Sequence, residues 1–178
     1  MRFAFDKAAG TERKHLTLVH KKNVLTFSGD LWQRVFDEVS ADYPQVSTGY
    51  DHIDAACIHF VERPERYDVI VTDNLFGDIL TDLGGAVAGG VGFAASANLN
   101  PARTGPSMFE PVHGTAPDIV GQNKANPLAA IISAGLMLDF LGEVEAGAKV
   151  AKVTSDPTRF VGSTTDIGDQ VVAEVLSA

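Results

Sequence analysis

Short strand-like segments alternate with amphipathic helical segments along the first half of the chain, and this alternation limits the fold more than any other feature. Runs rich in β-branched and large apolar residues predict three strands, over His15–His20, Val46–Tyr50 and Asp68–Thr72. A helix is expected between each pair of consecutive strands. Strands that alternate with helices form a mostly parallel sheet covered by helices, so the sequence predicts an α/β fold.

The spacing of apolar residues places the helices of this half. The first is expected to begin after Ser28 as its N-cap and to end before Pro44, with an apolar face made of Leu31, Trp32, Val35, Phe36 and Val39. The second is expected over Asp51–Val61, with an apolar stripe of Ile53, Ala56, Cys57, Phe60 and Val61. Residues 1–13 are charged and mixed and have no such period.

Glycine and proline divide the next part of the chain into shorter segments. A helical pattern over Leu75–Val87 passes into a glycine-rich stretch, and residues 98–106 are expected to form a loop. A short strand is expected at Ser107–Phe109, and an ordered loop over Glu110–Asn126.

Two helices are expected in the last part. Asn126 as a cap, Pro127 in the first turn and Gly142 at the end delimit the first of them. This helix is apolar nearly all round, so we expect it to be buried between other elements. The second is expected over Ile167–Leu176.

Composition narrows the class of protein. The chain has 178 residues and a formal net charge of −9, which argues against a nucleic-acid-binding surface because such a surface needs clustered positive charge. Its single cysteine, Cys57, suits a reducing compartment. The first residues lack the apolar run of a secretory signal, and the apolar run Leu128–Leu141 is shorter than the roughly 20 residues that span a bilayer. We therefore expect a cytoplasmic protein without a membrane partner.

Asp78 and Asp82 are the sharpest candidates for chemistry. They lie four residues apart, so on a helix they share one face, and they follow a predicted strand. Paired carboxylates suit Mg²⁺ or Mn²⁺. On spacing alone a plainer interpretation is favoured, in which both aspartates occupy the first turns of a helix because the helix dipole favours negative charge there.

Lys21 and Asp54 are further candidates. Lys21 follows a predicted strand directly, and a lysine near a metal and an apolar wall can have a lowered pKa and move protons. Asp54 lies at the edge of an apolar stripe, where a carboxylate is costly to bury without a partner or a metal. Taken alone, a solvated basic turn and a locally paired aspartate are the better interpretations.

The segment Phe109–Gly121 has the composition of an ordered loop with exposed backbone N–H groups. An acidic residue in such a loop can accept hydrogen bonds from both ribose hydroxyls of a dinucleotide. The chain contains no G-x-G-x-x-G sequence, so a Rossmann site is not indicated. A rigid connector is the alternative interpretation.

Together these segments resemble the β-decarboxylating dehydrogenases, the isopropylmalate/isocitrate dehydrogenase family. The resemblance runs from about Lys14 to Gly142. It rests on two highly specific strings in the family's order and approximate spacing, Asp73–Asp82 (DNLFGDILTD) and Phe109–Asp118 (FEPVHGTAPD). It makes the functional interpretations of these segments the better ones.

The resemblance implies roles for individual residues. A divalent metal, Mg²⁺ or Mn²⁺, would be held by Asp54, Asp78 and Asp82. Lys21 would transfer protons, with Asp54 as a second catalytic group, and the substrate would be held by Lys21, Asn23 and Asp54. Lys22 stands where relatives usually carry a small residue. The adenosine side of NAD would meet His113, Gly114, Ala116, Asp118 and Asn126, and Asp118 favours NAD because a carboxylate repels the 2′-phosphate of NADP.

The implied reaction is the NAD-dependent oxidative decarboxylation of 3-isopropylmalate to 2-oxoisocaproate, a step of leucine biosynthesis. Isocitrate, tartrate and homoisocitrate remain alternative substrates. The implied assembly is a homodimer with a shared active site, in which Lys21 and Asp54 serve the neighbouring subunit. A fragment that acts only as a dimerisation scaffold is an alternative of a different class.

Members of the family are longer than this chain. The resemblance therefore implies the carboxyl-terminal half of a two-domain fold, incomplete and inactive without its amino-terminal half. Residues 14–97 would form part of the dimerisation and substrate domain, and residues 98–178 the returning part of the cofactor domain. Residues 1–13 would be an amino-terminal segment of uncertain structure.

Overall fold

The structure is a computed structural model that describes all 178 residues, Met1–Ala178. The chain forms two compact units, Met1–Gly84 and Gly85–Ala178, which divide within helix α4 (Asn74–Val87). Residues 97 and 98, between which a domain boundary is expected, lie in β4 (Ala95–Asn98) of the second unit, and the expected domains and their roles stay a prediction.

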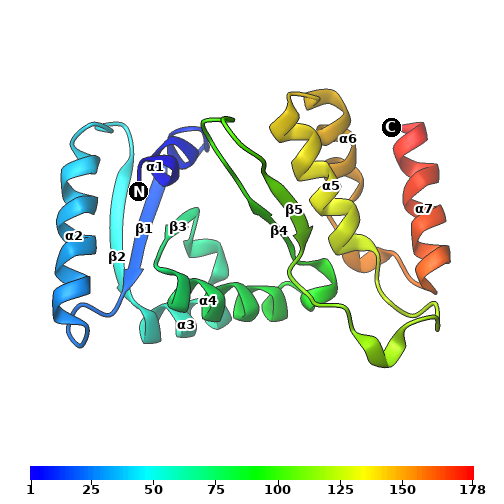
Figure 1. The fold of residues 1–178 in the computed structure, drawn as a ribbon, viewed down its shortest axis with the longest axis horizontal. Coiled ribbons are helices and arrows are strands. Elements are labelled where there is room, and N and C mark those ends of the chain that lie inside the picture. Colours follow the sequence, from blue (N-terminus) through cyan, green and yellow to red (C-terminus); the bar gives the residue numbers. More distant parts are fainter. The chain divides into compact units, whose positions relative to one another are not determined.

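The first unit is built on a three-stranded parallel sheet of order β2-β1-β3 (Figure 1). Its strands are β1 (His15–His20), β2 (Ser47–His52) and β3 (Val69–Val71). The central strand is buried along nearly its whole length, as its apolar sequence predicts. The α/β class and all three strands are confirmed, with bounds that differ by one or two residues at β2 and β3.

Four helices accompany this sheet: α1 (Arg2–Ala9), α2 (Thr26–Ser40), α3 (Ile53–Glu62) and α4. Alternate residues of β1 serve two cores. Leu16 and Leu18 pack with Phe5 of α1 and Phe36 of α2, whereas Val19 packs in a separate core. That second core contains Ala56 of α3 and Leu80 of α4. Successive strand residues point to opposite faces, so the sheet is covered on both sides.

Two features of this unit differ from expectation. Helix α1 was not predicted, because its eight residues are mixed and charged and only Phe5 and Ala8 among them are fully buried. Helix α2 begins at Thr26, so Ser28 lies inside its first turn and is not the N-cap. The helix starts early because the N–H of Leu25 already bonds the carbonyl of Lys21, which closes the preceding turn. Leu31, expected on the buried face, is exposed.

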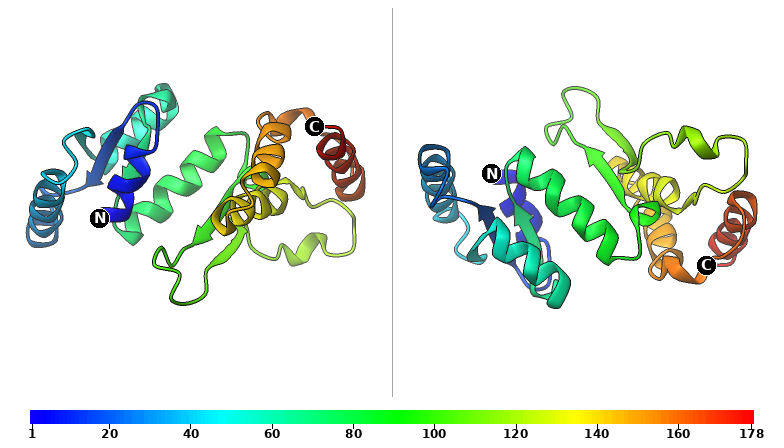
Figure 2. Two further views of the ribbon diagram at one scale, coloured as in Figure 1. Left: turned by 90° about the horizontal axis from the view of Figure 1, so that it is seen from above. Right: turned by 90° about the horizontal axis from the view of Figure 1, so that it is seen from below.

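The second unit combines an antiparallel hairpin with three helices. Strands β4 (Ala95–Asn98) and β5 (Met108–Pro111) pair with each other. Helix α5 (Leu128–Leu141) lies against this hairpin and beside α6 (Val144–Val153), as both views of Figure 2 show. Helix α7 (Thr164–Ser177) completes a core made of Leu128, Val153, Phe160, Ile167 and Val171.

Helix α5 confirms its predicted end at Gly142, but it begins one residue later than predicted, with Pro127 and not Asn126 at the N-cap position, and its predicted burial is wrong. The side chain of Asn126 accepts the N–H of Leu128 at 2.9 Å, and Gly142 takes the left-handed conformation with φ +94°. Leu136, Met137 and Leu141 are exposed, so only one face of this apolar helix is covered within the chain. None of the helices has the length and apolar character that crossing a membrane requires.

Candidate functional site

Lys21 stands at the carboxyl end of β1, in a turn fixed on both sides. We call residues Lys21–Leu25 the lysine turn. The carbonyl of Lys21 accepts the N–H groups of Val24 at 3.0 Å and of Leu25 at 2.8 Å. The N–H of Lys22 donates to the hydroxyl of Tyr50, and its ammonium group lies 4.5 Å from the centre of that ring. Lys22 therefore anchors the turn to β2, which leaves Lys21 free to point elsewhere.

The ammonium group of Lys21 reaches Asp54 in the first turn of α3. Nζ lies 2.5 Å from Oδ1, with the Lys21 side chain 21% exposed and the Asp54 side chain 68% exposed. The hydrogen bond from Lys21 lowers the pKa of Asp54 below its ordinary value. The structure thus brings together two predicted site residues from different elements. Asn23, in the same turn as Lys21, is exposed and makes no side-chain hydrogen bond.

Asp78 and Asp82 lie on α4 and are exposed. Their spacing places both on one face of the helix, as predicted. Oδ2 of Asp78 accepts from the side chain of Asn74 at 3.0 Å, and neither carboxylate makes an ion pair. Hard oxygen donors without a cationic partner have the chemistry that Mg²⁺ or Mn²⁺ requires.

The third predicted metal ligand, Asp54, is paired with Lys21 and does not join the other two. No group of three or more His, Cys, Asp or Glu side chains in the chain could hold a metal ion. The two carboxylates of α4 could therefore supply part of a metal's ligands. A complete set would need further ligands that do not lie beside them in this chain.

Sequence reasoning missed His20 and Asp73. His20 is 2% exposed, and its Nε2 lies 3.2 Å from Oδ2 of Asp73. Its ring stacks on Trp32 of α2 and meets Phe76 of α4 edge-on. The one available signal was positional, since each of the two residues stands where a strand of the parallel sheet ends.

A pocket of about 610 Å³ lies in the second unit, around the loop that carries the second specific string. Four of the five predicted cofactor residues line it: His113, Gly114, Ala116 and Asn126. The fifth, Asp118, does not; it lies exposed in the short 3₁₀ helix Pro117–Ile119. The pocket also has lining residues that the sequence did not predict, among them Val91, Gly92, Asn123, Lys124 and Thr164.

The walls of this loop pocket are held by hydrogen bonds to the start of α7. The N–H of Thr164 donates to the carbonyl of Asn123 at 3.0 Å, and the hydroxyl of Thr164 donates to the carbonyl of Ala125. On the opposite side, a Cβ on Gly92 would come within 3.2 Å of Asn126. The pocket therefore has walls tied by hydrogen bonds, and its lining combines apolar residues such as Val91 and Ile119 with a few polar side chains such as Asn126, which is the usual composition of a small-molecule site.

The fold is of the α/β class, and the chain belongs to the isocitrate/isopropylmalate dehydrogenase family, whose family model matches residues 1–176. The 3-isopropylmalate dehydrogenase of Nocardia farcinica is 60% identical over 98% of this chain and 53% of its own length. That of Thermobifida fusca is 56% identical over 98% of the chain and 51% of its own length. The chain spans about half the length of these relatives.

Solved structures agree with this family. The isocitrate dehydrogenase of Methylococcus capsulatus superposes with a TM-score of 0.90 at 36% identity, covering 98% of this chain and 54% of that one. A β-decarboxylating dehydrogenase of Thermococcus kodakarensis superposes with a TM-score of 0.81 at 36% identity, covering 99% and 53%. The fold class expected from the sequence, a part of this family's fold, is confirmed.

Proposed function

We propose that this chain supplies the lysine turn, the metal carboxylates and the adenosine pocket of an NAD-dependent, metal-assisted 3-isopropylmalate dehydrogenase. The contact between Lys21 and Asp54 carries the proposal, because it joins two predicted catalytic residues from separate elements at the carboxyl edge of the parallel sheet. The names and 56–60% identity of the two relatives above favour isopropylmalate over isocitrate, tartrate and homoisocitrate as the substrate.

Each residue has a distinct role in this proposal. The ammonium group of Lys21 moves a proton to or from the reacting carbon and oxygen atoms, and its contact with Asp54 orients it. Asn23, exposed in the same turn, binds the substrate together with Lys21 and Asp54. Asp54, Asp78 and Asp82 would hold Mg²⁺ or Mn²⁺, which when bound polarises the substrate's oxygen and stabilises the charge left by departing CO₂.

We also propose a homodimer with a shared active site, and the separation of the carboxylates supports it. Within one chain Asp54 faces Lys21, and no three-carboxylate cluster forms. We therefore assign Lys21 and Asp54 to the site of the neighbouring subunit, and Asp78 and Asp82 to the chain's own site. In this arrangement residues 14–97 act as the dimerisation and substrate part, and residues 98–178 act as the cofactor part.

The loop pocket, lined by His113, Gly114, Ala116 and Asn126 among others, is the proposed binding site for the adenosine end of NAD. Its apolar lining residues suit an adenine ring, and the polar side chain of Asn126 suits a ribose. Asp118 lies outside the lining, so its proposed contact with the ribose hydroxyls requires the cofactor to extend beyond the pocket toward the 3₁₀ helix. A cytoplasmic location stays a prediction from the sequence.

Metal binding tests the proposal directly. Mn²⁺ is titrated into the chain and followed by electron paramagnetic resonance, alongside Asp78→Asn and Asp169→Asn. Asp169 is an exposed aspartate on α7 and provides a matched loss of one charge. We expect about tenfold weaker Mn²⁺ binding in Asp78→Asn and no change in Asp169→Asn. Equal binding by all three proteins would contradict the metal assignment and favour the dimerisation scaffold.

A further inference from the structure

His20 and Asp73 lie between the two groups of candidate residues in the first unit. His20 is the last residue of β1 and directly precedes Lys21, whereas Asp73 directly precedes α4, which carries Asp78. Because β1 and β3 are parallel neighbours, their carboxyl ends meet at one edge of the sheet. The imidazole of His20 and the carboxylate of Asp73 therefore face each other where the lysine turn and α4 begin.

The two side chains compensate each other's burial. Nε2 of His20 lies 3.2 Å from Oδ2 of Asp73. Oδ2 of Asp73 has no hydrogen-bond partner, and neither has Nδ1 of His20. A buried polar atom without a partner is costly. The contact between the two residues is thus the one interaction that offsets the desolvation of Oδ2.

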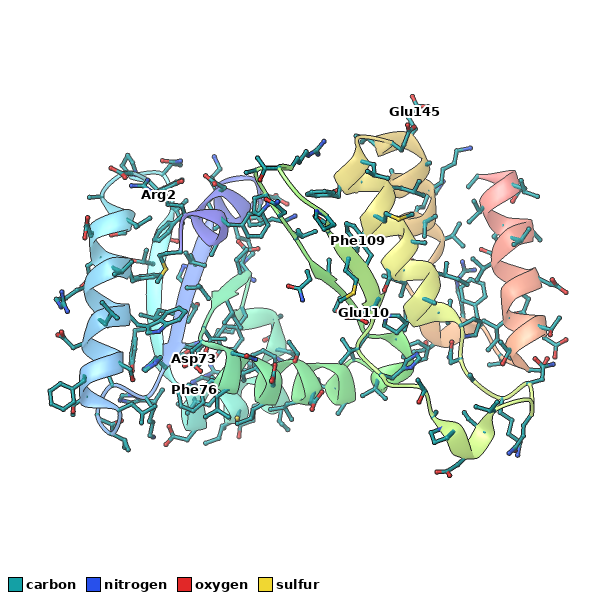
Figure 3. The ribbon with its side chains drawn as sticks, in the orientation of Figure 1. Arg2, Asp73, Phe76, Phe109, Glu110 and Glu145 are labelled. Carbon is teal, nitrogen blue, oxygen red and sulfur yellow. The ribbon has the colours of Figure 1, made fainter.

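The other oxygen of Asp73, Oδ1, makes a different contact. Oδ1 accepts the N–H of Phe76 at 3.2 Å, which is the contact of an N-cap residue with the first turn of its helix. Figure 3 shows Asp73 and Phe76 close together at the start of α4. One carboxylate therefore fixes the first turn of α4 with one oxygen and faces His20 with the other.

The ring of His20 is held in place on several sides. It lies 6.0 Å from the ring of Trp32 and 5.6 Å from the ring of Phe76, measured between centroids. Gly29 of α2 closes the remaining side, since a Cβ there would come 3.2 Å from Nδ1 and 2.5 Å from Cα of Lys22. His20 cannot turn away from Asp73 without losing these contacts, and the lysine turn packs on the same glycine.

We propose that His20 and Asp73 are a positioning pair that holds the lysine turn in a fixed register with the start of α4. Its catalytic meaning rests on the proposed function, in which Lys21 serves the neighbouring subunit's site and Asp78 the chain's own. The pair would then connect groups that belong to two different active sites of the dimer. Neither residue touches the substrate or the metal in this arrangement, and both act through the elements they join.

Amide hydrogen exchange in the full chain tests this proposal without metal or substrate. The reporters are the amides of Val24 and Leu25, both bonded to the carbonyl of Lys21. His20→Phe keeps the stacked ring but removes the N–H, and Asp73→Ser keeps a cap but removes the oxygen that faces His20. We expect each variant to speed exchange at these amides about tenfold. The double variant should be no faster, because each change breaks the same contact.

Rescue and matched controls separate positioning from general destabilisation. His20→Gln places an amide N–H near the position of Nε2 and should restore exchange close to the wild-type rate. Asp30→Asn removes an exposed carboxylate from α2 and should leave it unchanged. Three results would each overturn the proposed positioning pair. They are unchanged exchange in both single variants, additive effects in the double variant, and no rescue by glutamine. Loss of the Mn²⁺ result above would overturn the proposed function alone.

Discussion

The hydroxyl of Tyr67 donates to Oδ2 of Asp51 at 2.8 Å, and this hydrogen bond ties the segment before β3 to the buried end of β2. Asp51 is 9% exposed, and Arg66 pairs with its other oxygen. Burial, together with the hydrogen bond to Asp51, raises the pKa of Tyr67 above its ordinary value. The phenol is therefore a neutral donor to a buried carboxylate.

Replacing Tyr67 by Phe should destabilise the first unit. The substitution leaves Oδ2 of Asp51 without its donor, at a cost of about 1–2 kcal/mol. Urea unfolding followed by the fluorescence of Trp32, the single tryptophan, measures this loss. Tyr43→Phe is the matched control, because the hydroxyl of Tyr43 bonds the exposed Asp6 and its removal should cost less. Equal losses in the two variants would argue against the burial of Asp51 as the cause.

Replacing Lys21 by Met should raise the pKa of Asp54 toward its ordinary value of 3.8, because the hydrogen bond from Lys21 holds that pKa down. A depressed carboxyl pKa adds stability above pH 3.8, and this contribution is lost as the pH falls through the folded-state pKa. Carbon-detected NMR titration of the Asp54 carboxyl measures the shift. Lys22→Met removes a neighbouring charge that does not contact Asp54 and should move this pKa less.

Replacing Gly29 by Ala should destabilise the lysine turn even though alanine favours a helix. The added Cβ would lie 2.5 Å from Cα of Lys22, a backbone atom that cannot move independently. We expect a net loss of about 1–3 kcal/mol, larger than the gain in helix propensity. Trp32 fluorescence during urea unfolding reports it. Ser28→Ala on the same helix should change stability little, and a stable Gly29→Ala protein would show that the turn can shift.

Replacing Gly142 by Ala should weaken the end of α5. Gly142 has φ +94°, and no atom lies within 4 Å of a Cβ built there, so the effect isolates backbone strain. We expect a loss of about 1 kcal/mol from this strain. Gly168→Ala in α7 adds the same methyl group into open space without a positive φ and should stabilise slightly. Far-UV circular dichroism during urea unfolding compares the two variants, and the same sign in both would refute the strain argument.

The sequence predicted elements whose signals are local. The end of α5 followed from Gly142, its start from Asn126 and Pro127 to within one residue, and β1 from its apolar run. Strand β4 was not predicted because Ala95–Asn98 contains no β-branched or aromatic residue and becomes a strand through pairing with β5. Helix α6 was not predicted, although its apolar residues recur at a helical spacing.

The candidate site was predictable residue by residue but not as an arrangement. Two specific strings identified Asp78 and His113, while no spacing could show that Asp54 faces Lys21. That contact depends on how α3 packs beside β1. The loop pocket likewise draws Gly92 and Thr164 together from distant segments. Contacts between such distant segments depend on tertiary packing, and local sequence patterns do not show them.

The divided use of the Asp73 carboxylate has an evolutionary consequence. One oxygen caps α4 and the other faces His20, so position 73 is under two independent constraints. A glycine or alanine there would lose both interactions. Serine or threonine would keep the cap but would leave His20 without its partner. Among homologous chains, a lineage with serine or threonine at position 73 should therefore also lack the histidine at position 20. A lineage without the histidine can keep the aspartate, because the cap of α4 still uses it.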